Sequence, residues 1–163
     1  MPPPSARPAL SRLVRAGLTT FVVDGLFSSV LVVVFYRSTF SRLWQGVAST
    51  LLGPAAFTGG ARTTAIGLLM HCGVAFGWSA VFIFGVMRSG WIRRILGTHW
   101  GMLKVAALYG PAIWLVMSLA VIPLLLHRPP IISYRWWVQF FGHIPFVAIP
   151  IVASARGNPS TPP

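Results

Sequence analysis

Three ionisable side chains lie inside long apolar stretches of this sequence: Asp24, His71 and His143. On insertion scales, a charged group at the centre of a bilayer costs about 2.5–3.5 kcal/mol, so it needs a partner or a function. Asp24 is also the only acidic residue, against thirteen Lys and Arg residues. These three residues are therefore the first candidates for a functional site.

Other polar residues share helix faces with these three. Thr20, Asp24 and Ser28 recur at every fourth position, and Gln139 precedes His143 by four residues. Side chains at positions i and i+4 lie on one face of a helix, so each set predicts a polar stripe that faces other helices. The predicted site consists of Asp24, His71, His143, Thr20, Ser28, Tyr109 and Gln139.

Four interpretations of this set stay open. Asp24 could exchange a proton, with the histidines as relay partners, in a protein that handles protons, a small substrate or a cation. Asp24, His71 and His143 could instead bind a metal ion, or the two histidines could be axial ligands of a haem held between helices. The fourth interpretation is a structural or interaction subunit, in which hydrogen bonds from histidine, serine or Tyr109 to Asp24 only pack the bundle.

The composition places these residues in a membrane. The chain is 55% hydrophobic and 9% charged, with a mean hydropathy of +0.75, whereas soluble domains carry about 25% charged residues. This excludes a soluble enzyme. The basic residues that give the net charge of +12 lie between the apolar runs, where they would contact anionic lipid headgroups. The charge therefore does not indicate a nucleic-acid-binding protein. The sequence has no phosphate-binding loop, nucleophile elbow or cysteine cluster, so it predicts neither an enzyme nor a resident cofactor.

Four apolar runs are long enough to cross a bilayer. Between the first two, Phe40, Leu43, Trp44, Val47 and Leu51 recur at helical spacing, which predicts an amphipathic helix in the membrane interface. We therefore predict an all-α integral membrane protein, with four transmembrane helices in an up-down bundle. The expected spans are 17–36, 64–87, 102–126 and 136–153, and the interfacial helix covers about 40–53.

These elements form a single predicted membrane domain over residues 17–154. Residues 1–16, rich in Pro and Arg, are expected to be a flexible basic arm, and residues 155–163 a short disordered tail. Pro145 and Pro150 should kink the fourth span because each removes a backbone donor. A bundle this small encloses little volume, so transport would favour a homo-oligomer.

The distribution of basic residues predicts the orientation. Four spans return the chain to the side on which it starts. That side carries eight basic residues (Arg7, Arg12, Arg15, Arg88, Arg93, Arg94, Lys104 and Arg156), and the other carries five (Arg37, Arg42, Arg62, Arg128 and Arg135). The excess predicts that both termini are cytoplasmic in a multi-pass inner (plasma) membrane protein.

Several short motifs follow one another along residues 17–156. They are Asp24-Gly25, Gln45 to Gly53, Ala56-Phe57, Gly59-Gly60, Gly67, His71, Ala75, Tyr109-Gly110, Met117, Pro123, His143 and Pro150. Their order and spacing resemble an uncharacterised family of small four-helix bacterial membrane proteins, usually described as hypothetical inner-membrane proteins. The chain departs from the family pattern at Ser118, where an Asn is frequent, and at Thr50, where a Gly is usual. The resemblance implies the four-span fold and marks Asp24, His71 and His143 as family features, but it implies no activity.

Overall fold

The structure is a computed structural model that describes residues 6–156. Every element in this range is a helix or a helical turn. In chain order these are α1 (Ala6–Val30), η1 (Leu31–Phe35), α2 (Phe40–Leu52), η2 (Gly53–Thr58), α3 (Gly60–Ala80), η3 (Val81–Gly85), η4 (Val86–Arg88), α4 (Gly90–Leu96), α5 (Gly101–Val116), η5 (Met117–Val121), α6 (Ile122–Leu126), α7 (Tyr134–His143), η6 (Ile144–Ala148) and α8 (Ile149–Arg156).

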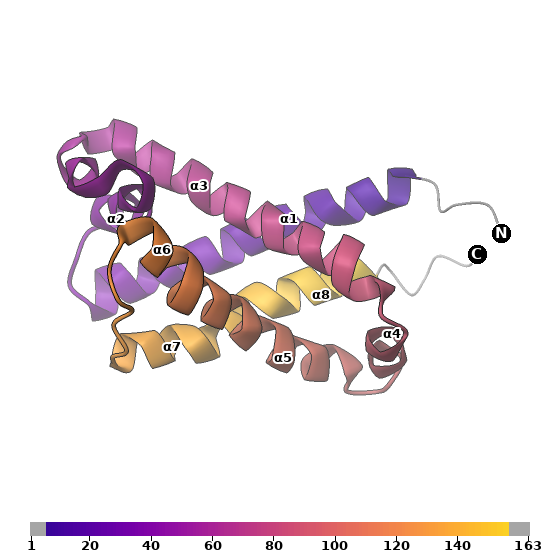
Figure 1. The fold of residues 1–163 in the computed structure, drawn as a ribbon. Helices are drawn as coiled ribbons and strands as arrows, with labels where there is room; N and C mark the ends of the chain where they lie inside the picture. Colours follow the sequence, from indigo (N-terminus) through magenta and orange to yellow (C-terminus); the bar gives the residue numbers. More distant parts are fainter. Residues whose placement is uncertain (1–5, 157–163) are drawn as a thin grey trace.

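Four continuous helices are long and apolar enough to cross a membrane. They cover Ala9–Phe35, Gly60–Arg88, Gly101–Leu126 and Tyr134–Arg156. The four helices pack as a bundle, with the shorter α2 between the first and second spans (Figure 1). The predicted all-α, four-span fold is confirmed.

The first helix begins earlier than the sequence indicates. It starts at Ala6 instead of Gly17, so residues 6–16 are helical and are not part of a flexible arm. The guanidinium of Arg15 donates a hydrogen bond of 2.7 Å to the carbonyl oxygen of Ser154, which ties this helix to α8. Residues 1–5 and 157–163, which hold the rest of the predicted arm and tail, lie outside the described residues.

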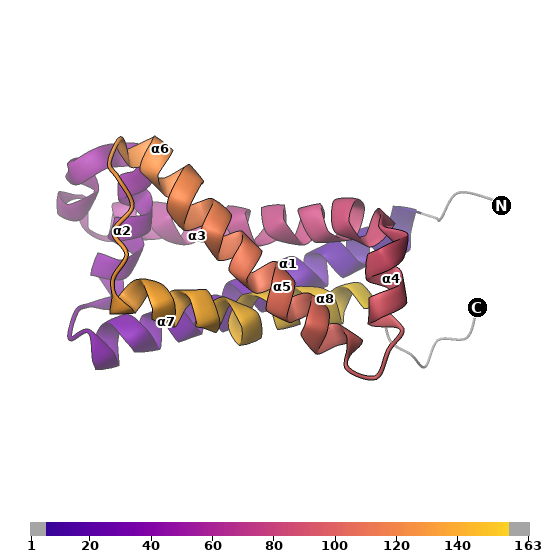
Figure 2. The same cartoon turned by 60° about the horizontal axis from the view of Figure 1, so that its bottom comes forward.

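The spans are antiparallel, and each end of the bundle has its own connections. The short α4 lies at the end where α1 begins and α8 ends, while α2 and α6 lie at the opposite end (Figures 1 and 2). The main apolar core includes Phe82, Val105, Ile113 and Ile151, from the second, third and fourth spans. This core leaves room for a cavity nearer the α2 end.

Two glycines allow backbones to touch directly. A Cβ atom at Gly67 would lie 1.9 Å from the carbonyl oxygen of Trp44, and one at Gly110 would lie 2.6 Å from that of His143. No side chain fits at either position, so the glycines permit α2 to pack on α3 and α5 to pack on the fourth span.

Each span contains a five-residue π-helical segment with widened turns: η1, η3, η5 and η6. The predicted disturbance at Pro145 coincides with η6, where the residue after Ile144 has no amide hydrogen to donate. Such segments are frequent at functional sites, and η5 contributes Met117 and Val121 to the cavity described below.

Candidate functional site

A cavity of about 510 Å³ lies among the helices and extends from the middle of the spans toward α2. At about 1.5 Å rise per residue, Asp24, His71 and His143 each lie within about 5 Å of the middle of their span. Most of the wall is apolar, including Met70, Val74 and other side chains from α2, α3 and the third span. The polar side chains on the wall are Thr20, Asp24, Ser28, Thr50, His71, Gln139 and His143.

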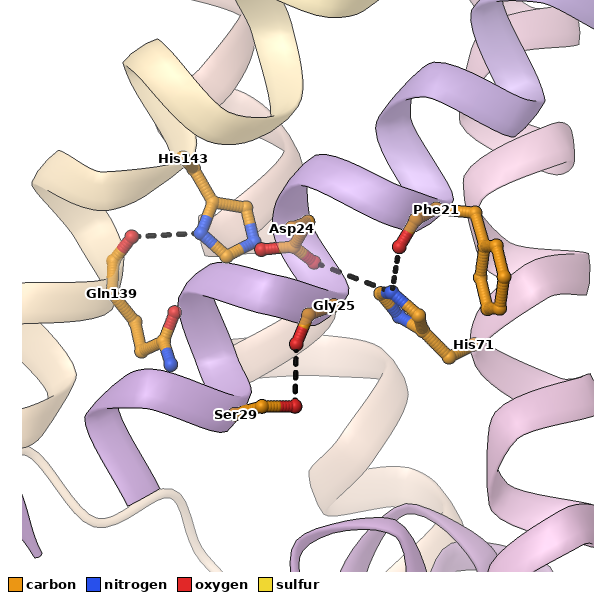
Figure 3. A network of polar contacts seen from close by, with 7 residues as sticks. All are labelled: Phe21, Asp24, Gly25, Ser29, His71, Gln139 and His143. Atoms are coloured by element: carbon orange, nitrogen blue, oxygen red, sulfur yellow. Dashed lines mark hydrogen bonds and ion pairs between the residues drawn. The ribbon is translucent and has the colours of Figure 1, made fainter. Parts of the chain in front are cut away.

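Asp24 and His71 form a buried pair between α1 and α3. The Nε2 atom of His71 lies 3.8 Å from Oδ2 of Asp24, and the two side chains are 13% and 14% exposed (Figure 3). The same Nε2 atom lies 3.3 Å from the carbonyl oxygen of Phe21. A carbonyl oxygen only accepts hydrogen bonds, so this nitrogen carries the hydrogen. That hydrogen is donated to Phe21, and the carboxyl oxygen of Asp24, at 3.8 Å, lies beyond hydrogen-bond distance.

In His143 the ring hydrogen lies on the other nitrogen, Nδ1. Its Nδ1 atom donates a hydrogen bond of 2.7 Å to the carbonyl oxygen of Gln139, one turn earlier in α7. In a neutral imidazole with hydrogen on Nδ1, the Nε2 atom is an acceptor. Figure 3 shows the His143 ring directed toward Asp24, with Asp24 between the two histidines. The Asp24 carboxyl group therefore lies beside the His71 ring, but among residues 6–156 its side chain accepts no hydrogen bond from either histidine.

Several buried polar atoms on the cavity wall make no hydrogen bond within residues 6–156. They are Oδ1 of Asp24, Oγ1 of Thr20 and Nε1 of Trp114. Such exceptions are rare because an unsatisfied buried polar atom costs about 1–3 kcal/mol. The wall therefore includes donors and acceptors that no described residue satisfies.

Aromatic rings pack against both histidine rings. The His71 ring lies between Trp44 and Phe21, with centroid distances of 5.0 and 5.5 Å, and the His143 ring lies 4.9 Å from Trp114. Trp44 and Trp114 are not among the site residues predicted from the sequence.

The structure brings together six of the seven predicted site residues. Tyr109 is the one that does not line the cavity. Its hydroxyl donates a hydrogen bond of 2.7 Å to the carbonyl oxygen of Trp78, and its ring lies 4.9 Å from that of Phe82 in the apolar core. Tyr109 therefore links α5 to α3 and does not reach Asp24.

The geometry does not favour the metal or haem interpretations. Within the part of the chain that the structure describes, no group of three His, Cys, Asp or Glu side chains is placed to hold a metal ion. A haem ligated by His71 and His143 would have to occupy the space between them, where Figure 3 places Asp24.

Comparisons with protein families, with curated proteins and with solved structures find no match for this chain. The fold and the site therefore define its class by themselves. This is a helical, multi-pass membrane protein with a buried His71–Asp24 pair in a cavity at the middle of its spans.

Proposed function

We propose that this chain handles protons together with a small substrate or cation, and that Asp24 is the group that accepts them. The observation that carries this proposal is the position of the only acidic side chain between two imidazoles on the wall of a mid-span cavity. A carboxyl group costs several kcal/mol at this depth, so its burial beside a cavity favours a functional role.

The two histidines suit successive steps of proton transfer. A protonated Asp24 can pass its hydrogen to Nε2 of His143, and an ionised Asp24 is stabilised by a protonated His71, whose Nε2 lies 3.8 Å from Oδ2 of Asp24. A cation bound at the carboxylate takes the place of the proton, so binding of the cation releases the proton. Binding of the cation and release of the proton are therefore coupled at the Asp24 carboxylate.

The shape and lining of the cavity limit the ligand. Its volume of about 510 Å³ is within the range of small-molecule sites, about 300–1,000 Å³. Apolar walls with a few convergent polar groups favour a compact molecule that is mostly apolar and carries one cationic or hydrogen-bonding group.

The test is proton flux into proteoliposomes that contain a pH-sensitive dye. We expect Asp24→Asn to insert and fold but to reduce the flux to that of empty liposomes. Tyr109→Phe is the matched control because it also removes a buried mid-span polar group, yet one that does not line the cavity. Flux that is equal in the two variants would contradict the proposal.

A structural or interaction subunit is the second candidate. It is favoured by the contacts of His71 with Phe21 and Asp24, which join the first and second spans. In that case Asp24→Asn lowers the thermal stability in detergent and leaves any flux unchanged.

We also propose that the chain belongs to the family of small four-helix bacterial inner-membrane proteins that it resembles, and that it forms a homo-oligomer. Both ends of the described chain lie at the α4 end, which carries the larger set of basic residues, so both termini are proposed to be cytoplasmic. A reporter fused after Pro163 that is active only outside the cytoplasm would contradict this orientation.

A further inference from the structure

A second cavity, of about 420 Å³, lies at the α2 end of the bundle, where α1 ends and α7 begins. Its wall includes much of the segment between α6 and α7, which crosses this end of the bundle in Figure 2. Its polar side chains include Arg128, Arg135, Tyr36 and Ser133. The cavity is therefore basic, in contrast to the central one.

The two arginines have no acidic partner. Asp24 is the only acidic side chain of the protein, and it lines the central cavity instead. The guanidinium of Arg128 makes no hydrogen bond or ion pair with any residue from 6 to 156. That of Arg135 lies 4.2 Å from the centre of the Tyr36 ring and donates a hydrogen bond of 3.1 Å to the hydroxyl of Tyr134. Both arginines are exposed and are therefore open to an anionic group of another molecule.

The hydroxyl of Tyr36 adds a neutral donor to this cavity. It is buried and has no hydrogen-bond partner among the described residues. Burial raises the pKa of the Tyr36 phenol above its ordinary value, so the group keeps its hydrogen at neutral pH. An anion held by the arginines would accept a hydrogen bond from it.

The two cavities share part of their walls. Trp114, Ile122, Leu126 and Gln139 line both of them. A molecule anchored at the basic mouth can therefore extend an apolar portion along Ile122 and Leu126 toward the central cavity. Ile131, which lines the second cavity, is 83% exposed, as expected for a mouth in contact with lipid.

We propose that the second cavity binds the anionic group of a phosphate- or carboxylate-bearing amphiphile through Arg128, Arg135 and Tyr36, with the apolar part of the molecule against Ile122 and Leu126. Arginine is well suited to this role because its planar fork matches phosphate and carboxylate oxygens. The proposal does not depend on proton exchange at Asp24, which is not part of this cavity.

The test uses phosphatidic acid as the probe and native mass spectrometry of the full chain released from a non-ionic detergent. We expect the Arg128→Gln/Arg135→Gln variant to retain phosphatidic acid at least about tenfold more weakly than the wild type. The matched control is Arg42→Gln/Arg62→Gln, which removes two exposed charges from the same end of the bundle but outside this cavity. This control should bind as the wild type does.

Further binding measurements distinguish an amphiphile in this cavity from an inorganic anion. Phosphatidylcholine with the same acyl chains should bind weakly, and excess inorganic phosphate should not displace phosphatidic acid. Tyr36→Phe should weaken binding several-fold without changing the melting temperature. Equal loss in the two arginine variants, or displacement by inorganic phosphate as effective as by the lipid, would overturn the proposal.

Discussion

Replacement of Gly67 by alanine tests whether α2 forms a fixed wall of the central cavity. The added Cβ atom would lie 1.9 Å from the carbonyl oxygen of Trp44. An ordinary carbon–oxygen contact is about 3.4 Å, so α2 and α3 must separate by about 1.5 Å. Both contacting groups are backbone or fixed to it, and no side-chain rotation relieves the clash.

The expected magnitude follows from two opposing effects. Overpacking costs about 1–3 kcal/mol, and a backbone clash belongs at the upper end of that range. The higher helix propensity of alanine relative to glycine stabilises the helix by about 1 kcal/mol. We therefore expect Gly67→Ala to lower the free energy of unfolding by about 2 kcal/mol. Gly73→Ala in the same helix is the control, because a Cβ atom there meets nothing within 4 Å, and it should be neutral or stabilising.

The assay is reversible unfolding in mixed micelles with increasing fractions of SDS, followed by circular dichroism. Movement of α2 would also displace Trp44 from the His71 ring, so we expect Gly67→Ala to change the tryptophan emission. If Gly67→Ala is as stable as Gly73→Ala, the direct packing of α2 on the backbone of α3 is refuted.

Three further substitutions separate the site from its surroundings. Tyr109→Phe should cost about 0.5–1.5 kcal/mol of stability, since it removes the hydrogen bond to Trp78, and proton flux should stay unchanged; lost flux would contradict its place outside the site. Gly110→Ala should reduce both stability and flux in the same assays, because its Cβ atom would push against the carbonyl group of His143; wild-type values for both would contradict that contact. Thr20→Val should leave the melting temperature unchanged or raise it, because the buried hydroxyl has no partner among residues 6–156; a large fall would show that the hydroxyl is already bonded.

The spans follow from the sequence because each is an uninterrupted apolar run, and a bilayer demands such runs. The helix over Phe40–Leu52 also follows, from the helical spacing of its apolar residues. The start of the first helix does not follow. A Pro- and Arg-rich segment is typical of a flexible arm, and its helical state depends partly on the contact of Arg15 with Ser154, which is distant in the sequence.

The site was predictable where it depends on helix periodicity and depth. The spacing of Asp24 and His143 with their polar neighbours predicts inward-facing stripes, and the position of all three ionisable residues inside apolar runs marks them as site candidates. The position of Tyr109 and the role of Trp114 were not predictable in this way. They depend on how each helix is rotated about its axis, which close backbone contacts such as that at Gly110 determine.

The most direct test of the central claim is infrared spectroscopy of the purified protein during a pH titration. Asp24 is the only side-chain carboxyl group, so the carboxylic C=O band of the protein reports on it alone, apart from the C-terminal carboxyl group. We predict a band that appears and disappears reversibly with pH, that is absent in Asp24→Asn and that shifts in His143→Ala. A difference spectrum that is the same in the wild type and in Asp24→Asn would contradict proton exchange at this site and would leave Asp24 as a packing residue.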